Sequence, residues 1–196
     1  MKKMFIACIL AFFVIFVPVP LVSQSLDWQI QFLKGAAAES VPVNETIRME
    51  NVGEFQLNIK ADSDGYCYVI CYGSNREIFV LYNQAVKSGT EIKSGPVYIT
   101  TSSGRNETIF VIMSLSKQTD LEGLMANHAT NPSPQHTQNL YRGISSLQRT
   151  VSGLGEPRSA ILTSAGTDRS PGNNDRILGT KFSGKDIYVQ PITIRP

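Results

Sequence analysis

Short runs of alternating apolar and polar residues, separated by turn-forming residues, dominate the chain from Gln29 to Leu115. Such alternation is typical of strands with one buried face, and it is clearest at residues 55–60. The segment 66–72, Tyr-Cys-Tyr-Val-Ile-Cys-Tyr, is apolar on both faces and rich in aromatic and β-branched residues, which predicts a central strand. Further strands are expected at residues 46–49, 77–82, 96–100 and 107–115, with a short one around Ile92.

The four residues Asp62-Ser63-Asp64-Gly65 separate two of these strands. Asp and Gly tolerate the left-handed backbone angles of a tight reversal, so Asp62, Asp64 and Gly65 predict a turn. The Asp-x-Asp-Gly spacing could also begin a calcium loop. An EF-hand, however, needs further oxygen ligands and a Glu at its twelfth position, whereas an apolar strand follows Gly65. We therefore expect no metal and no cofactor here.

The pattern changes after Leu115. Thr119 and Glu122 have the spacing of a capping box, which predicts the start of a short helix whose apolar face carries Leu121, Leu124 and Met125. Residues 127–138 contain two prolines and both histidines, His128 and His136, and are expected to form a loop.

A second helix and a final strand are expected beyond that loop. The helical spacing of apolar residues from Leu140 to Val151 predicts an amphipathic helix of three to four turns. Residues 164–176 are rich in Gly, Ser, Asn, Asp and Arg and predict an exposed loop. Residues 187–194 predict a closing strand, which Pro191 places at an edge or a bulge.

These elements predict a mainly β protein: an antiparallel β-sandwich with one or two short helices in its C-terminal half. We expect residues 1–25 to be a signal peptide and 26–54 an N-terminal strand segment. Residues 55–117 then form the β core. Residues 118–196 add the helical segment, a flexible loop and the closing strand to the same domain.

The first 25 residues have the three parts of a secretory signal. Lys2 and Lys3 supply positive charge, and all fourteen residues from 4 to 17 are apolar. This run fits a signal core of roughly 7–15 residues and is shorter than the ~20 needed to span a bilayer. Cleavage is expected after Ser25, with Ser23 as the alternative. An uncleaved anchor is the other interpretation, but the prolines at 18 and 20 and the short run argue against it. The mature protein should be periplasmic or extracellular, with no stable membrane span.

Removing these residues changes the charge. The whole chain of 196 residues carries a net +2, and both excess charges are Lys2 and Lys3. The mature chain of 171 residues is therefore neutral, with 16 basic and 16 acidic residues. Nucleic-acid binding needs clustered Lys and Arg, so no nucleic-acid partner is expected.

Two cysteines remain in the mature chain, Cys67 and Cys71. Four residues of strand separate their Cα atoms by about 13 Å, whereas a disulfide requires less than about 7 Å. We interpret them as small buried side chains on one face of the strand. A metal pair or an intermolecular bridge remains as the alternative.

Several motifs, in order, resemble the DUF4384 domain family. They are Asp-Ser-Asp-Gly-Tyr at 62–66, Phe-Val-Leu-Tyr-Asn at 79–83 and Glu-Thr-Ile-Phe-Val-Ile-Met-Ser at 107–114. The resemblance covers residues 55–117. It departs from the family pattern at Tyr82-Asn83 and at Thr100-Thr101, which lack the usual prolines. The family has no assigned activity. Its domains often accompany bacterial kinases, caspase-like peptidases or repeat proteins, so the resemblance implies a binding or regulatory module.

The sequence contains neither Gly-x-Ser-x-Gly nor His-Glu-x-x-His, and its two histidines fall in the expected loop. We therefore predict a non-catalytic module that binds another envelope protein or a surface polymer. A hydrolase or ligand-processing enzyme with an unfamiliar site is the alternative. Tyrosine is frequent at interfaces, so a possible interaction surface comprises Tyr66, Tyr68, Tyr72 and Tyr82. The competing interpretation is that this strand face belongs to the core.

Overall fold

The computed structural model describes residues 25–49, 52–73, 75–100, 106–152, 158–164 and 176–195. The signal-peptide prediction, apart from Ser25, and the greater part of the loop predicted at 164–176 lie outside these residues. No helix in the described ranges is both long and apolar enough to cross a membrane.

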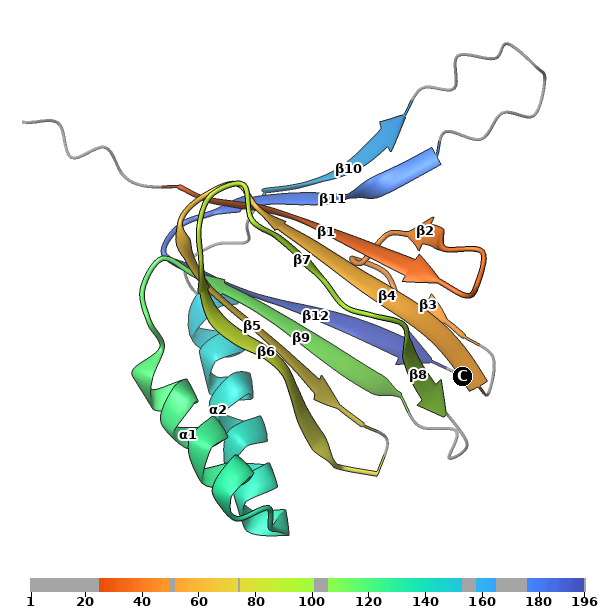
Figure 1. Cartoon of the computed structure of the whole chain (residues 1–196). Coiled ribbons are helices and arrows are strands. Elements are labelled where there is room, and N and C mark those ends of the chain that lie inside the picture. The colour runs from red at the N-terminus through yellow and green to blue at the C-terminus, as the bar shows by residue number, and fades with distance from the viewer. Residues whose placement is uncertain are drawn as a thin grey trace, which may run out of the picture.

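Two β-sheets pack face to face, and a pair of helices covers the outer face of one of them (Figure 1). The first, the seven-stranded sheet, has the order β10-β11-β1-β4-β7, with β2 paired to β1 and β8 paired to β4. Its strands are β1 (Leu26–Lys34), β2 (Glu39–Val41), β4 (Val52–Ala61), β7 (Glu91–Lys93), β8 (Val97–Thr100), β10 (Arg158–Ser164) and β11 (Arg176–Gly184).

The second, the five-stranded sheet, has the order β3-β12-β9-β5-β6. Its strands are β3 (Ile47–Arg48), β5 (Gly65–Tyr72), β6 (Ile78–Val86), β9 (Glu107–Ser114) and β12 (Ile187–Arg195). All its pairings are antiparallel except β3 with β12, which is parallel. The predicted fold class, a mainly β sandwich with two short helices in the C-terminal half, is confirmed.

Aromatic side chains fill the space between the sheets. Trp28 of β1 is fully buried and stacks on Phe182 of β11, with ring centroids 5.3 Å apart. Phe32 stacks on Phe55 of β4 at 4.9 Å. Because side chains alternate along β1, every second residue from Leu26 to Phe32 is buried while those between are half-exposed.

The five-stranded sheet has a second buried face under the helices. In β5, Cys67, Val69 and Cys71 contribute to the core between the sheets, and Tyr68 and Ile70 contribute to the core under the helices. The prediction of a strand apolar on both faces is confirmed, and β5 lies between β9 and β6.

The helices are α1 (Thr119–Thr130) and α2 (Pro134–Ser152), so the loop predicted at 127–138 is wrong. Only residues 131–133 connect the two helices. Ser133 accepts a hydrogen bond on Oγ from the His136 N–H at 3.2 Å, and Pro134 occupies the first helical position. A serine cap followed by proline begins a helix, because the cap binds a free N–H and proline lacks one.

The capping box predicted at Thr119 and Glu122 is also wrong. Gln118 occupies the cap position without a side-chain cap, and Thr119 is already helical. Glu122 instead accepts a hydrogen bond from the Tyr68 hydroxyl and pairs with Lys117, whose Nζ lies 2.9 Å away.

The turn predicted at Asp62 to Gly65 is present, but it does not form a hairpin. It carries the chain from β4 in one sheet to β5 in the other. Gly65 does not have a positive φ. A Cβ there would lie 2.4 Å from the Ser114 carbonyl oxygen of β9, so this position requires glycine because two backbones approach closely.

Pro191 lies inside a continuous strand, β12. β12 pairs with β9 from Ile187 to Ile194, whereas β3 covers only Ile194 and Arg195 on its other side. The predicted edge position is confirmed over most of the strand in the described residues, and a residue without an N–H is tolerated there.

Candidate functional site

The tyrosines predicted as an interaction surface divide between two environments. Tyr68 is fully buried, and Tyr66 and Tyr72 are half-buried against the cluster under α1 and α2. The interaction-surface prediction is therefore wrong for Tyr68, because the helix pair already covers this face of the sheet. Tyr82 of β6 lies on the opposite face and packs, half-buried, against the core between the sheets.

Tyr68 joins the sheet to the beginning of α1. Its hydroxyl accepts a hydrogen bond from the Gln118 N–H at 2.9 Å and donates one to Glu122 Oε1 at 3.2 Å. Burial raises the Tyr68 pKa to about 12, and the neighbouring Glu122 carboxylate adds to the effect. Tyr68 thus binds the N–H of the residue at the cap position, the contact that the predicted capping box gives to the Glu122 side chain.

A wide groove opens where the β5–β6 turn meets the connection between the helices. We call it the helix-tip groove and define it by Tyr72, Arg76, Phe79, His128, Gln138 and Tyr141. Its volume is about 1010 Å³. The rings of Tyr72 and Tyr141 lie 4.5 Å apart, and Phe110 supports Tyr141 edge-on at 6.3 Å. The groove therefore has an aromatic wall held in place by the core.

Among the described residues, each histidine ring contacts a backbone carbonyl oxygen and not a serine hydroxyl. His128 is helical, and its Nε2 lies 3.2 Å from the Ile78 carbonyl oxygen, while its Nδ1 is buried without a partner. His136 Nδ1 lies 2.6 Å from the Asn131 carbonyl oxygen. Ser133 also lines the groove, but its hydroxyl caps α2. The expectation that the histidines lie in a loop is wrong, because His128 belongs to α1 and His136 to α2.

An exposed apolar strand borders the groove. Phe79, Val80 and Leu81 of β6 are 53%, 39% and 43% exposed. β6 has no charged residue over its nine positions, and among the described residues it pairs only with β5. We call this strand the open edge. Contiguous exposed apolar side chains of this kind mark interaction sites.

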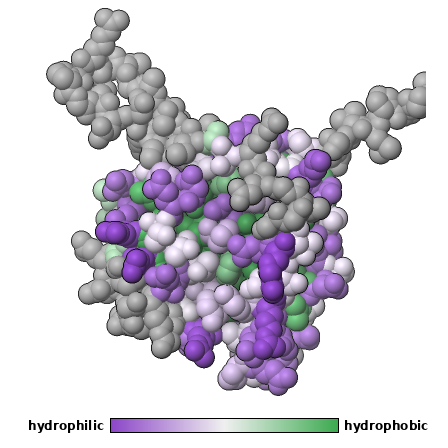
Figure 2. All heavy atoms as spheres, turned by 180° about the vertical axis from the view of Figure 1, so that it is seen from behind, coloured by the Kyte–Doolittle hydropathy of each residue, from purple (hydrophilic) through white to green (hydrophobic). Residues whose placement is uncertain are grey.

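The face seen from behind the view of Figure 1 has a mixed surface. Seen from behind, most of the coloured surface is hydrophilic or neutral, and hydrophobic atoms appear only in small areas between polar ones (Figure 2). The region of the helix pair, at the lower right of this view, is mainly hydrophilic.

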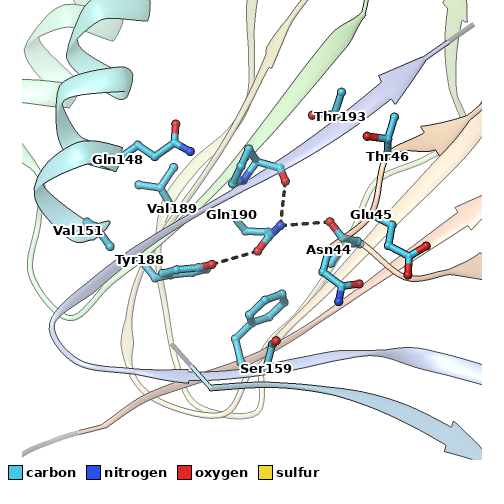
Figure 3. Close-up of a pocket in the computed structure, with 13 residues that line it drawn as sticks. Asn44, Glu45, Thr46, Gln148, Val151, Ser159, Tyr188, Val189, Gln190 and Thr193 are labelled. Atoms are coloured by element: carbon cyan, nitrogen blue, oxygen red, sulfur yellow. Dashed lines mark hydrogen bonds between the residues drawn. The ribbon is translucent and has the colours of Figure 1, made fainter. Parts of the chain in front are cut away.

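A smaller pocket of about 390 Å³ lies beside β12 and is organised around Gln190 (Figure 3). The amide of Gln190 donates to the carbonyl oxygens of Val43 at 3.1 Å and Pro191 at 2.8 Å, and its Oε1 accepts from the Tyr188 hydroxyl. Each polar atom of this buried side chain has a protein partner. Gln190 therefore joins β12 to the segment that precedes β3, at a point of β12 with which β3 itself does not pair.

The two cysteines are free and buried, and both belong to the core between the sheets. The interpretation of small buried side chains on one strand face is confirmed. Burial raises the pKa of each thiol to about 12. No group of three or more His, Cys, Asp or Glu side chains in the described ranges is arranged to hold a metal ion.

Asp62 and Asp64 serve the crossover between the sheets. Asp64 accepts hydrogen bonds from Lys87 at 2.9 Å and from the Ser88 N–H at 2.8 Å, which lower its pKa. Asp62 accepts a hydrogen bond from Gln29, and Lys60 and Lys181 lie near it at 3.8 Å. Both carboxylates are therefore bound by groups that hold neighbouring strands.

Comparison with family models, with curated proteins and with solved structures finds no match for this chain. The DUF4384 resemblance remains a prediction, carried by the three motifs at 62–66, 79–83 and 107–114.

The sequence prediction placed contacts at the sheet face or edge and in residues 127–138 and 164–176, and it named Tyr72 and Tyr82, but it indicated neither the pairing of Tyr72 with Tyr141 nor the exposed run 79–81. The run Ile-Phe-Val-Leu at 78–81 was recognised as strand but not as exposed, because an unbroken apolar run normally indicates burial. The Ser133-Pro134 pair could have indicated that α2 begins at Pro134. The groove at the helix tips depends on that early start of α2.

Proposed function

We propose that this chain is an exported, non-catalytic module that binds another protein of the cell envelope through the helix-tip groove. The observation that carries the proposal is the aromatic wall formed by Tyr72 and Tyr141 in an open groove of about 1010 Å³. Aromatic side chains supply large apolar contact area with little loss of side-chain entropy, and they dominate the energetics of protein interfaces.

The rest of the groove suits a polypeptide of mixed character. Arg76 and Glu77 place opposite charges at the β5–β6 turn, and Gln138 and Thr137 supply an amide and a hydroxyl from α2. Such polar groups orient a partner around an apolar centre. A surface polymer with many hydroxyl groups could use the same amide and aromatic groups, and the experiment below separates the two.

Export rests on the leader alone. The proposal expects the mature chain recovered from the envelope fraction or the medium to begin at Leu26, or at Gln24 if the alternative site is used. N-terminal sequencing of that chain tests it. A chain that keeps residues 1–23 and remains with the membrane would overturn it.

The binding site is tested with a photo-crosslinking amino acid at Tyr141, which is 37% exposed in the groove. The matched control carries the same group at Tyr98, which is 68% exposed on β8 of the other sheet. In intact cells we expect one discrete protein adduct from the Tyr141 position and none from the Tyr98 position. Equal adducts at both positions, or none at either, would refute groove binding.

Two further outcomes are informative. An adduct that glycosidase treatment reduces to the mass of the chain alone would identify a surface polymer in place of a protein. Turnover of a peptide or ester substrate that disappears in His128→Ala would favour the hydrolase alternative, since His128 lines the groove.

A further inference from the structure

The side chains of the helix-tip groove limit the kind of protein segment that it can hold. Three of them are aromatic and come from three different elements: Tyr72 from β5, Phe79 from β6 and Tyr141 from α2. Pro132 and Pro134, where the two helices meet, also line the groove and are exposed. Aromatic rings present broad, rigid faces, and such faces suit a ligand that is itself rigid before it binds.

A peptide that adds a strand to β6 is unsuited to this groove. Strand addition needs a regular row of free backbone groups along the edge. The Ile78 carbonyl oxygen, at the start of β6, already lies 3.2 Å from His128 Nε2. Further along, the pairing of β6 with β5 shifts by one residue at Leu81, which reverses the backbone groups that face outward. The edge beside the groove is therefore interrupted at two points.

A helical segment is also unsuited. An amphipathic helix binds through aliphatic side chains that repeat over about two turns, and these side chains enter an apolar groove. Apart from the two prolines, Ile78 is the one aliphatic side chain among the described residues that line the groove, and it is 5% exposed. The accessible walls are aromatic or polar, so they offer little to aliphatic anchors.

A polyproline II segment needs the groups that the groove does present. This helix has three residues per turn and no internal hydrogen bonds, so its carbonyl oxygens point outward and require donors from a partner. Arg76, Gln138 and the hydroxyls of Tyr72 and Tyr141 supply donors around the aromatic faces. In the part of the chain that the structure describes, these four polar groups form no hydrogen bond or ion pair with another residue.

We propose that the helix-tip groove binds a proline-rich segment of its envelope partner in the polyproline II conformation. The inference rests on the proposed function, because it names the class of segment that the same groove takes. Proline rings pack on the faces of Tyr72 and Tyr141, whose centroids lie 4.5 Å apart, and the carbonyls between them accept from Arg76 and Gln138. Such a segment is extended before it binds, so little conformational entropy is lost.

The first test uses a fluorescently labelled decaproline peptide, which adopts this conformation in water. Anisotropy titration with the mature chain should show saturable binding, whereas a labelled Gly-Ser peptide of the same length should not bind. Tyr141→Ala should raise the dissociation constant for decaproline about tenfold, since aromatic anchors dominate contacts of this kind. Tyr98→Ala is the matched control, with an exposed aromatic removed from the other sheet, and should leave the dissociation constant unchanged.

A second variant keeps the test decisive if the first one is poorly folded, because Tyr141 also packs on Phe110. Gln138 is exposed, so Gln138→Leu removes an amide donor from the groove without altering the core. It should raise the dissociation constant for decaproline by roughly two- to tenfold, the range expected for one hydrogen bond. Circular dichroism and melting curves confirm that each variant is folded.

The second test identifies the segment that the groove holds in cells. The protein adduct formed by the photo-crosslinking group at Tyr141 is digested, and the attached partner peptide is sequenced by mass spectrometry. We expect prolines three residues apart in that peptide, because a polyproline II helix repeats after three residues and presents such prolines on one face.

The two tests separate this inference from the proposed function. Failure of decaproline to bind, or a partner peptide without proline, would overturn the inference, while the adduct itself would still support groove binding. Absence of any adduct at Tyr141 would overturn the proposed function. Equal binding of decaproline and the Gly-Ser peptide, or equal losses in Tyr141→Ala and Tyr98→Ala, would show that the groove does not recognise polyproline II.

Discussion

Replacing Tyr68 with phenylalanine tests how the helix pair is held on the sheet. The substitution keeps the ring in its buried position and removes only the hydroxyl. That hydroxyl accepts from the Gln118 N–H at 2.9 Å and donates to Glu122 at 3.2 Å. Tyr68→Phe therefore leaves the N–H at the beginning of α1 without its acceptor, and α1 has no side-chain cap to replace it.

The expected cost follows from these two contacts. A buried donor left without an acceptor costs about 1–3 kcal/mol, and a typical hydrogen bond contributes about 1 kcal/mol net. Glu122 keeps its ion pair with Lys117, so the loss of its hydrogen bond from the Tyr68 hydroxyl costs little. We expect the free energy of unfolding to fall by about 2–3 kcal/mol. For a domain of this size the melting temperature should then drop by about 4–12 °C.

Thermal and urea unfolding of the mature chain, followed by circular dichroism, measure this change. Tyr98→Phe is the control, because Tyr98 is 68% exposed and loses only a surface hydroxyl. Its free energy of unfolding should stay within about 0.5 kcal/mol of the wild-type value. If Tyr68→Phe melts within 1 °C of the wild type, on the same scale as the control, the hydroxyl does not anchor α1.

The pH dependence gives an independent readout. The folded pKa of Tyr68 is about 12, above its ordinary value of 10.0. The folded state therefore holds this proton more tightly than the unfolded state. Its contribution to stability is complete below pH 10 and is lost as the pH rises from 10 to about 12. Tyr68→Phe should lose less stability than the wild type over that interval.

Three further predictions follow from the two cores. Gly65→Ala should destabilise the fold by about 1–3 kcal/mol, since the new Cβ would lie 2.4 Å from the Ser114 carbonyl oxygen. A melting temperature equal to that of the wild type would contradict this close approach. Cys67 and Cys71 should not react with a thiol reagent at pH 8 in the native state, because burial raises both pKa values to about 12. Both should react in denaturant. Rapid reaction of the native protein would refute their burial. Trp28, the one tryptophan, is fully buried, so its emission should be blue-shifted and resist iodide quenching until the sandwich unfolds.

The local sequence was sufficient to predict a helix or strand where one residue type or one spacing determines it. Seven residues at 66–72 with no charged side chain could only be a buried strand, and the apolar spacing from Leu140 to Val151 requires a helix face. The start of α2 was also encoded locally, in Ser133 and Pro134. The loop prediction for residues 127–138 rested on their polar composition and two prolines, which a capped helix start shares with a loop.

The pairing of strands and the burial of sheet faces depend on segments that are distant in sequence. β1 pairs with β11, more than 140 residues later, and no local pattern indicates that contact. The turn from Asp62 to Gly65 is short enough for a hairpin, but its strands belong to different sheets because β5 finds β9 and β6 instead. For the same reason the run from Phe79 to Leu81 is exposed at an edge strand, although its apolar composition indicates burial.

The position of β1 has a consequence for export. Leu26, the first residue after the proposed cleavage site, is already buried in β1 opposite Gly184 of β11. β1 lies between β4 and β11, so, under the proposed export, it cannot be completed until nearly the whole chain has emerged on the far side of the membrane. Such long-range pairing folds slowly, because distant segments must meet before any contact stabilises them. The leader peptidase would therefore meet an extended, unpaired N-terminus, and cleavage would precede closure of the sandwich.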